Sequence, residues 1–128
     1  QVPPKINFEP MRIVLAEDND ILRKSLSFFL ESKGYTVDQF SDGKDALDAI
    51  ETNSYDLILT DINMPEMNGF EFLDALLKHK GINCDQFNIF ILTSSLNNKD
   101  KEQATQYPIL KGYLEKPLDI SNLQKLIA

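Results

Sequence analysis

The chain has 128 residues, of which 42% are hydrophobic and 26% are charged, and this balance is typical of one soluble globular domain and excludes a disordered chain. The formal net charge of −7 argues against direct nucleic-acid binding, because clustered Lys and Arg residues bind a phosphate backbone. Cys84 is the only cysteine, which excludes an internal disulfide, and no apolar run is long enough to cross a membrane, so we expect a cytoplasmic protein.

The first half of the chain predicts a strand, a helix, a strand and a helix in turn. An unbroken apolar run over 13–16 indicates a strand that is buried on both faces, and Glu17 and Asp18 follow it. The next helix ends at Gly34, and β-branched and aromatic residues over 35–40 then favour a second strand, which ends at an Asp-Gly turn signal. The residues expected on the inner faces of the two helices are Leu22, Leu26, Phe29 and Leu30, and then Ala46, Leu47 and Ile50.

The second half of the chain continues this alternation. The expected elements are a strand over 57–59, a helix from Gly69, a strand over 89–92, a weaker polar helix over 99–107, a strand over 112–115 and a short helix over 120–127. The helix that starts at Gly69 is expected to bury Phe70, Leu73, Leu76 and Leu77. The three strands of this half lead into Asp61, into Thr93 and into Lys116-Pro117.

Strands that alternate with helices predict right-handed crossover connections and a parallel sheet with helices on both faces. Five such units favour the flavodoxin-like doubly wound α/β class, whose strand order is 2-1-3-4-5. We expect this domain to span residues 11–128 and residues 1–10 to be a linker or an added remnant, so that the chain is one piece of a longer protein. In open sheets of this kind, ligands bind beyond the carboxyl ends of the strands.

Residues of complementary chemistry stand at the ends of four predicted strands, and the fold would bring them to one edge. They are Glu17, Asp18, Asp61, Thr93 and Lys116. Three converging carboxylates repel one another and should hold a hard cation such as Mg²⁺. With that ion present, one carboxylate can act as a nucleophile toward phosphorus, while a Lys ammonium and a Thr hydroxyl stabilise charge on the phosphoryl oxygens. The set therefore favours phosphoryl transfer.

Each of these residues alone also has an ordinary explanation. An acid after a strand is usually a loop residue or a helix N-cap, and Asp18 could be such a cap. A Thr at a strand end mostly packs, and a Lys-Pro pair mostly forms a turn. It is the conjunction of suitable residue types at one edge that carries weight. His79 is interpreted as a solvated residue near a helix C-terminus, and Cys84 as an incidental residue of a polar loop.

Four segments at the strand ends resemble the receiver domains of two-component response regulators. They are RIVLAEDN with Glu17 and Asp18, DLILTDINMPEMNGFEFL with Asp61, ILTSS with Thr93, and GYLEKPL with Lys116. The resemblance extends over residues 11–128, and as a set the four segments are highly specific. It implies a signalling domain that is not a conventional enzyme and that catalyses, at most, its own Mg²⁺-dependent phosphorylation and dephosphorylation.

The resemblance also implies a role for each matching position, with Asp61 as the phosphoacceptor. The implied Mg²⁺ ligands are Asp18, Asp61 and the backbone carbonyl of Asn63, with Glu17 acting through a metal-bound water. The residues implied to bind the phosphoryl group or to switch with it are Thr93, Lys116 and Tyr113, an aromatic residue at the position that swings inward on activation. The residues implied to shape the site are Pro65, Gly69, Ser94 and Pro117.

The implied phosphoryl donor is a phosphohistidine on a sensor histidine kinase or on a histidine phosphotransfer protein. An effector domain or an attached kinase in the full-length protein, and a phosphorylation-dependent dimer, would be consistent with the same resemblance, whereas direct contact with nucleic acid or membrane is not expected. The sequence departs from the family pattern at three places. They are Glu17 instead of the commoner Asp, Ser94 instead of a smaller Ala, and Pro108, Ile109 and Leu110 instead of the usual Ala-Gly-Ala spacing before Tyr113.

Three rival functions share parts of this pattern. A phosphatase that passes through an aspartyl phosphate needs a general acid, but Asn63 stands two residues after Asp61, and an amide cannot supply that proton. Flavin binding would require a hydroxyl- and amide-rich phosphate loop, and the acidic run over 17–20 would repel the phosphate. A receiver that serves only as a docking module is disfavoured because every reacting position is filled, but it stays open.

Overall fold

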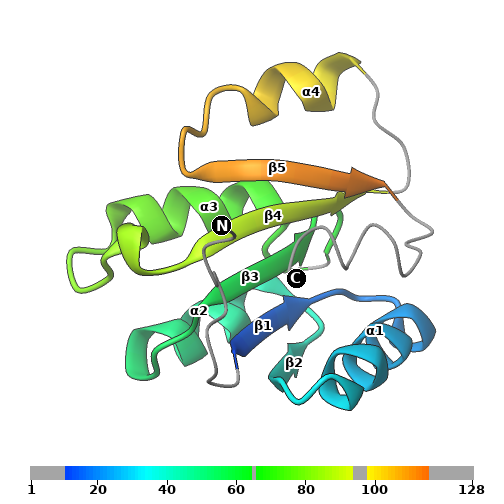
Figure 1. Cartoon of the computed structure of the whole chain (residues 1–128). Helices are drawn as coiled ribbons and strands as arrows, with labels where there is room; N and C mark the ends of the chain where they lie inside the picture. Colours follow the sequence, from blue (N-terminus) through cyan, green and yellow to red (C-terminus); the bar gives the residue numbers. More distant parts are fainter. Residues whose placement is uncertain (1–10, 65, 94–97, 116–128) are drawn as a thin grey trace, which may run out of the picture.

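The computed structural model of the chain describes residues 11–64, 66–93 and 98–115. Its centre is a five-stranded sheet in the order β2-β1-β3-β4-β5, in which every neighbouring pair is parallel (Figure 1). The strands are β1 (Arg12–Ala16), β2 (Thr36–Phe40), β3 (Leu57–Asp61), β4 (Asn88–Thr93) and β5 (Leu110–Glu115). The predicted flavodoxin-like class and strand order are therefore confirmed, and each predicted strand lies within two residues of the observed bounds.

Helices alternate with these strands as predicted. They are α1 (Asp20–Ser32), α2 (Gly43–Thr52), α3 (Gly69–Lys78), the 3₁₀ turn η1 (Cys84–Gln86) and α4 (Asn98–Ala104). α4 ends three residues earlier than predicted, because a proline at 108 disfavours helical backbone in the residue before it and the intervening residues form a turn. The short helix predicted over 120–127 lies outside the described residues. Among the described helices, none is both long enough and apolar enough to span a membrane.

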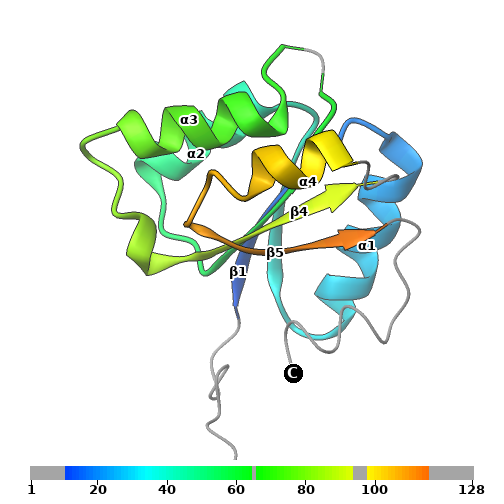
Figure 2. The same cartoon turned by 90° about the horizontal axis from the view of Figure 1, so that it is seen from above.

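The sheet is covered by α1 on one face and by α2 and α3 on the other (Figure 2). Because successive side chains of a strand point to opposite faces, β1 contributes Ile13 and Leu15 to the core beside α1, and Val14 and Ala16 to the core beside α2 and α3. All four side chains are fully buried. A central strand without a solvated face explains the unbroken apolar run in the sequence.

α3 buries a different stripe of side chains from the one that the spacing predicts. Three of the four expected residues are buried, but Leu77 is 48% exposed and Phe72 is fully buried instead. α3 packs against α2, and a Cβ placed on Gly43 of α2 would stand 3.0 Å from the Cβ of Phe72. The prediction for Leu77 is therefore wrong, because the contact with α2 turns the buried stripe of α3 toward Phe72.

The pairing of β4 with β5 contains a one-residue irregularity. Ile89 lies opposite Leu110, but the next residue of β4, Phe90, lies opposite Gly112. Lys111 is thus an extra residue in β5, which is the arrangement of a β-bulge. Beyond this point the two strands stay in regular register to their carboxyl ends.

Candidate functional site

The carboxyl ends of β1, β3 and β4 are in register with one another. Ala16 lies opposite Thr60, so the residues that follow them, Glu17 and Asp61, are neighbours across the sheet. Asp61 in turn pairs with the residue that precedes Thr93. The three strands therefore bring two acids and a hydroxyl to one edge, as the strand-end pattern predicts.

Three carboxylates form an acidic cluster at this edge, made of Glu17, Asp18 and Asp61. One oxygen from each side chain lies within 4.8 Å of the other two. Glu17 is fully buried and Asp61 is 5% exposed, whereas Asp18 is exposed. Like charges at such distances repel, and more strongly where water is excluded. Mg²⁺ binds a few carboxylate oxygens together with waters. This cluster suits a divalent cation of that type, because it supplies carboxylate oxygens and one of its residues, Asp18, faces solvent.

Local hydrogen bonds orient the two buried acids. Oε2 of Glu17 accepts a hydrogen bond from the backbone N–H of Asn19 at 3.0 Å, and Oδ1 of Asp61 accepts one from the backbone N–H of Ile62 at 2.9 Å. A guanidinium N–H of Arg23 on α1 donates to the backbone carbonyl of Glu17 at 3.0 Å. The first turn of α1 therefore holds the segment that carries Glu17 and Asp18.

The N-cap of α1 is Asn19, whose side chain accepts a hydrogen bond from the N–H of Leu22 at 3.0 Å. The alternative interpretation of Asp18 as this cap is therefore wrong, and the Asp18 carboxylate lies in the acidic cluster instead. The sequence alone could not separate the two residues, because Asn and Asp are about equally good N-caps and a predicted helix start is uncertain by a residue or two.

The loop that follows Asp61 is closed by a glycine. The N–H of Gly69 donates to the carbonyl of Ile62 at 2.8 Å, and a Cβ at position 69 would collide with the carbonyl oxygen of Asp61. This close approach of two backbones explains why a glycine stands there. Asn63 is exposed within this loop. Four predicted site residues lie outside the described residues: Pro65, Ser94, Lys116 and Pro117.

Thr93 and Tyr113 differ in their burial. Thr93 is 4% exposed at the end of β4, whereas Tyr113 is 44% exposed on β5, opposite Ile91. Tyr113 lines a groove of about 340 Å³ between α4 and β5, together with Lys101, Ala104, Tyr107, Leu110 and Gly112. The tyrosine ring therefore belongs to an exposed groove in this structure, while the threonine belongs to the buried edge.

His79 and Cys84 make definite contacts that the sequence did not reveal. Nε2 of His79, at the end of α3, lies 2.8 Å from a carboxylate oxygen of Glu51 on α2. Cys84 is half-buried, with its Sγ 3.8 Å from the carbonyl oxygen of Leu76, and it packs against the core beside α2 and α3. The interpretations of a merely solvated histidine and an incidental cysteine are therefore incomplete, because both residues help to join neighbouring elements.

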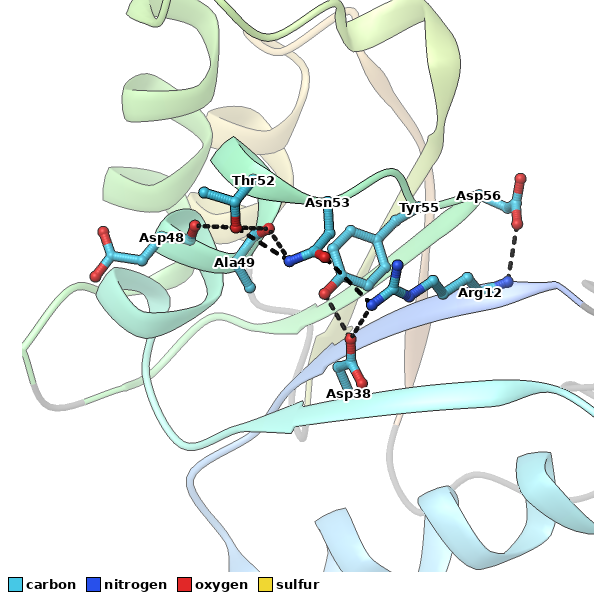
Figure 3. Close-up of polar contacts among 8 residues, drawn as sticks. All are labelled: Arg12, Asp38, Asp48, Ala49, Thr52, Asn53, Tyr55 and Asp56. Atoms are coloured by element: carbon cyan, nitrogen blue, oxygen red, sulfur yellow. Dashed lines mark hydrogen bonds and ion pairs between the residues drawn. The ribbon is translucent and has the colours of Figure 1, made fainter.

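A second polar group, the amino-edge network, lies toward the opposite ends of the strands (Figure 3). Arg12 is 3.3 Å from a carboxylate oxygen of Asp38, and its guanidinium lies 4.8 Å from the ring centroid of Tyr55. Oη of Tyr55 donates to the same Asp38 oxygen at 2.6 Å. The pKa of Tyr55 is raised to about 12, chiefly by burial and to a smaller extent by the hydrogen bond to Asp38 and the charge of that carboxylate. The backbone N–H of Arg12 donates to Asp56 at 2.8 Å, and its guanidinium is 3.5 Å from Asn53.

Known sequences resemble this chain over most of its length. The family model of the response regulator receiver domain matches residues 13–128. The response regulator ArlR of Staphylococcus saprophyticus is 32% identical over 112 residues, which cover 88% of this chain and 48% of ArlR. The chain spans about half the length of ArlR and of a probable transcriptional regulator of Pyropia yezoensis, and 6% of the length of a hybrid histidine kinase of Dictyostelium discoideum.

Solved structures share the fold. The chemotaxis protein CheY4 of Vibrio cholerae superimposes with a TM-score of 0.82 at 28% identity, over 93% of this chain and 97% of that chain. The receiver domain of the sensor histidine kinase PA1611 of Pseudomonas aeruginosa has a TM-score of 0.81 at 28% identity, over 93% and 95% of the two chains, and that structure holds a magnesium ion in its active-site cleft. The strand order, the acidic edge and these matches lead to one conclusion: the chain belongs to the response regulator receiver domain family.

Proposed function

We propose that this chain is a phosphoacceptor of two-component signalling and that Asp61 receives the phosphoryl group. The observation that carries the proposal is the acidic cluster, whose three carboxylates lie within 4.8 Å of one another at the carboxyl edge of the sheet. Packing gives no reason to bury two acids beside a third, because buried charges are costly. Metal-assisted phosphoryl transfer requires such a set. Membership of the family supports the same function.

The proposed metal ligands are Asp18, Asp61 and the backbone carbonyl of Asn63, with Glu17 acting through a bound water. The acidic cluster supplies the hard oxygens that Mg²⁺ prefers, and the exposure of Asp18 leaves one side of the cluster open to water. The magnesium ion in the PA1611 receiver structure supports this choice of metal. When bound, Mg²⁺ would neutralise charge on the acids and on the phosphoryl oxygens.

In the proposed reaction, a carboxylate oxygen of Asp61 attacks the phosphorus of a phosphohistidine on the partner. An O–P bond forms while the P–N bond breaks, and the imidazole leaves as a neutral ring because its other nitrogen carries a proton. The N–H of Ile62, 2.9 Å from Oδ1 of Asp61, keeps the carboxylate oriented during the attack. Thr93 and Lys116 then donate hydrogen bonds to the transferred phosphoryl oxygens.

The proposed output is a switch between two arrangements of Thr93 and Tyr113. The added negative charge draws the Thr93 hydroxyl toward the phosphoryl group, and the Tyr113 ring moves into the space that the threonine leaves. The exposed position of Tyr113 beside the groove between α4 and β5 is compatible with the state before phosphorylation. The change in this groove would then be the signal that a partner recognises.

The proposed donor is a sensor histidine kinase or a histidine phosphotransfer protein. Because the curated relatives are longer than this chain, an attached effector domain or kinase is part of the proposal. We further propose that the receiver domain itself covers residues 11–128, that residues 1–10 act as a linker, and that the protein works in the cytoplasm. Its catalysis would be limited to its own phosphorylation and dephosphorylation.

Intact-mass spectrometry after incubation with acetyl phosphate, with and without Mg²⁺, tests the phosphoacceptor. The variant Asp61→Asn removes the proposed nucleophile, and Asp48→Asn is the matched control because Asp48 is an exposed acid on α2, outside the acidic cluster. With acetyl phosphate, we expect wild type and Asp48→Asn to gain one phosphoryl group only when Mg²⁺ is present. We expect Asp61→Asn to gain none in either condition.

Three results would contradict parts of this proposal. A gain that persists in Asp61→Asn would move the acceptor to another residue. A gain that does not depend on a divalent cation would remove the proposed role of Mg²⁺. No gain in any variant, with acetyl phosphate or with a phosphorylated histidine phosphotransfer protein, would favour a docking module that is never phosphorylated.

A further inference from the structure

The first turn of α2 contacts the loop that follows Asp61. The backbone N–H of Gly43 donates to the carbonyl of Met67 at 3.1 Å, and Met67 immediately precedes the N-cap of α3. Among the backbone hydrogen bonds of residues 63–64 and 66–68, which the structure describes, no other reaches an element other than β3 and α3. This loop carries Asn63, so the contact from α2 supports the segment that is proposed to supply a metal ligand.

Gly43 leaves no room for a side chain at this contact. A Cβ there would stand 2.8 Å from the carbonyl oxygen of Met67 and 3.0 Å from the Cβ of Phe72, whereas non-bonded carbon atoms prefer roughly 3.5–4.0 Å. The Met67 oxygen belongs to the backbone, and Phe72 is fully buried in the core. Neither can give way without a shift of the loop or of α3, so the requirement at position 43 is for space.

The first turn of α2 is itself firmly held. Asp42 is 8% exposed and caps the helix, with Oδ1 accepting hydrogen bonds from the backbone N–H groups of Lys44 at 2.7 Å and Asp45 at 3.1 Å. Ala46, in the same turn, is fully buried against the sheet. A capped and buried first turn is a rigid support, so the position of the Met67 carbonyl follows the position of α2.

We infer that Gly43 is a positioning residue for metal binding, because through Met67 it sets where the loop holds the carbonyl of Asn63 relative to Asp61. This inference rests on the proposed function. It adds Gly43, a residue outside the acidic cluster, to the residues that influence Mg²⁺ binding. Groups that hydrogen-bond to metal ligands typically change metal affinity by roughly 10-fold to 100-fold when they are altered, and we expect the lower end of this range for a residue that acts through Met67. Gly43 acts by its lack of a side chain rather than by a bond to the ligand.

Isothermal titration with Mg²⁺ alone tests this role without any phosphodonor. The variant Gly43→Ala adds the Cβ, and Gly34→Ala is the matched control. Gly34 has a φ of 95° at the end of α1, with open space around it, so an alanine there destabilises the fold through backbone strain alone. We expect the Mg²⁺ dissociation constant to rise roughly 10-fold in Gly43→Ala and to stay at the wild-type value in Gly34→Ala.

A second pair of variants decides the matter if Gly43→Ala does not fold. Asp42→Ala removes the cap of α2 and loosens the first turn, whereas Asp42→Asn removes the charge and keeps a good cap. We expect weaker Mg²⁺ binding in Asp42→Ala and wild-type binding in Asp42→Asn. Equal affinities in these two variants would overturn the inference, because capping would then have no influence on the metal.

The outcomes of the titration separate this inference from the proposed function. Wild-type affinity in Gly43→Ala, or an equal loss in Gly34→Ala, overturns the positioning role and leaves Asp61 as the proposed acceptor. A wild-type chain that binds no Mg²⁺ overturns the proposed metal site itself. Circular dichroism of each variant, recorded in the same buffer, establishes that folded protein is compared.

Discussion

The two ends of the sheet use carboxylates in opposite ways. In the amino-edge network, Asp38 accepts a hydrogen bond from Tyr55 at 2.6 Å and lies 3.3 Å from Arg12. The negative charge of Asp38 is therefore compensated by a hydroxyl donor and a guanidinium. In the acidic cluster, Asp61 lies within 4.8 Å of two other carboxylates. β3 connects the two regions, since Tyr55 stands just before this strand and Asp61 is its last residue.

This difference separates stability from ligand binding. A polar network whose members bind one another stabilises the fold by itself. A group of like charges opposes folding, and a cation that binds it in the folded state alone restores stability. Mutations in the amino-edge network should therefore lower stability and leave the response to Mg²⁺ unchanged. Mutations that remove a carboxylate of the acidic cluster should raise stability in the absence of Mg²⁺ and weaken the response to Mg²⁺.

The largest effect is expected from Tyr55→Phe. This variant removes a hydrogen bond to a charged group, so the free energy of unfolding should fall by about 2 kcal/mol, while Mg²⁺ binding stays at the wild-type value. Urea unfolding followed by circular dichroism measures the change. Tyr35→Phe is the control, because Tyr35 is half-buried beside α1, and its change should stay within about 0.5 kcal/mol. Equal losses in both variants would contradict the role of the network.

The same hydrogen bond should make stability sensitive to alkaline pH. In the folded protein the pKa of Tyr55 is raised from 10.0 to about 12, chiefly by burial and then by Asp38. A group whose folded pKa lies above its unfolded value contributes stability that is complete below the unfolded pKa and is lost as the pH rises through the folded pKa. The urea midpoint should therefore fall between pH 10 and about 12.

Tyr55→Phe is the matched comparison for this pH dependence, and its urea midpoint should fall less over the same window. Some dependence should remain, because burial and a hydrogen bond to Asp74 also raise the pKa of Tyr107. Identical slopes in wild type and Tyr55→Phe would show that Tyr55 does not titrate as its contacts require.

The smallest effect, of opposite sign, is expected from Asp18→Asn. Removing one of three neighbouring carboxylates should raise the free energy of unfolding in Mg²⁺-free buffer by about 0.5 kcal/mol, a modest amount because water screens an exposed charge. The stabilisation that Mg²⁺ gives to wild type should disappear. Thermal unfolding with and without Mg²⁺ measures both, with Asp48→Asn as the control. A loss of stability in Mg²⁺-free buffer would remove the distinction between the two regions.

The sheet could be predicted from the sequence because its central strands are buried on both faces and therefore form unbroken apolar runs. The helices were less certain, since helical spacing defines a buried stripe only to within a residue or two. The helical spacing predicts Leu77 in the core, but Leu77 is exposed, because the contact with α2 selects Phe72 instead. That contact joins segments distant in sequence, and periodicity within α3 contains no information about it.

The acidic cluster could be predicted because parallel strands align their carboxyl ends, whatever their separation in the chain. The contacts of Gly43 with Met67 and of Tyr55 with Asp38 could not, because each joins a regular element to a loop residue, and loops have no periodicity from which a contact could be predicted. The Asp-Gly pair at 42 and 43 indicates a turn by its sequence, and in the structure it also forms the cap and the first residue of α2. The role of Lys116 stays a prediction.

The bulge in β5 gives the segment before it tolerance to changes in length. In a regular ladder an additional residue would reverse which face Tyr113 presents and would move the end of the strand by about 3.3 Å. Here the additional residue is Lys111, which bulges out of the ladder, so that Tyr113 still lies opposite Ile91. One residue more in the connection between α4 and β5 is therefore compatible with a far strand end that keeps its alignment with Thr93.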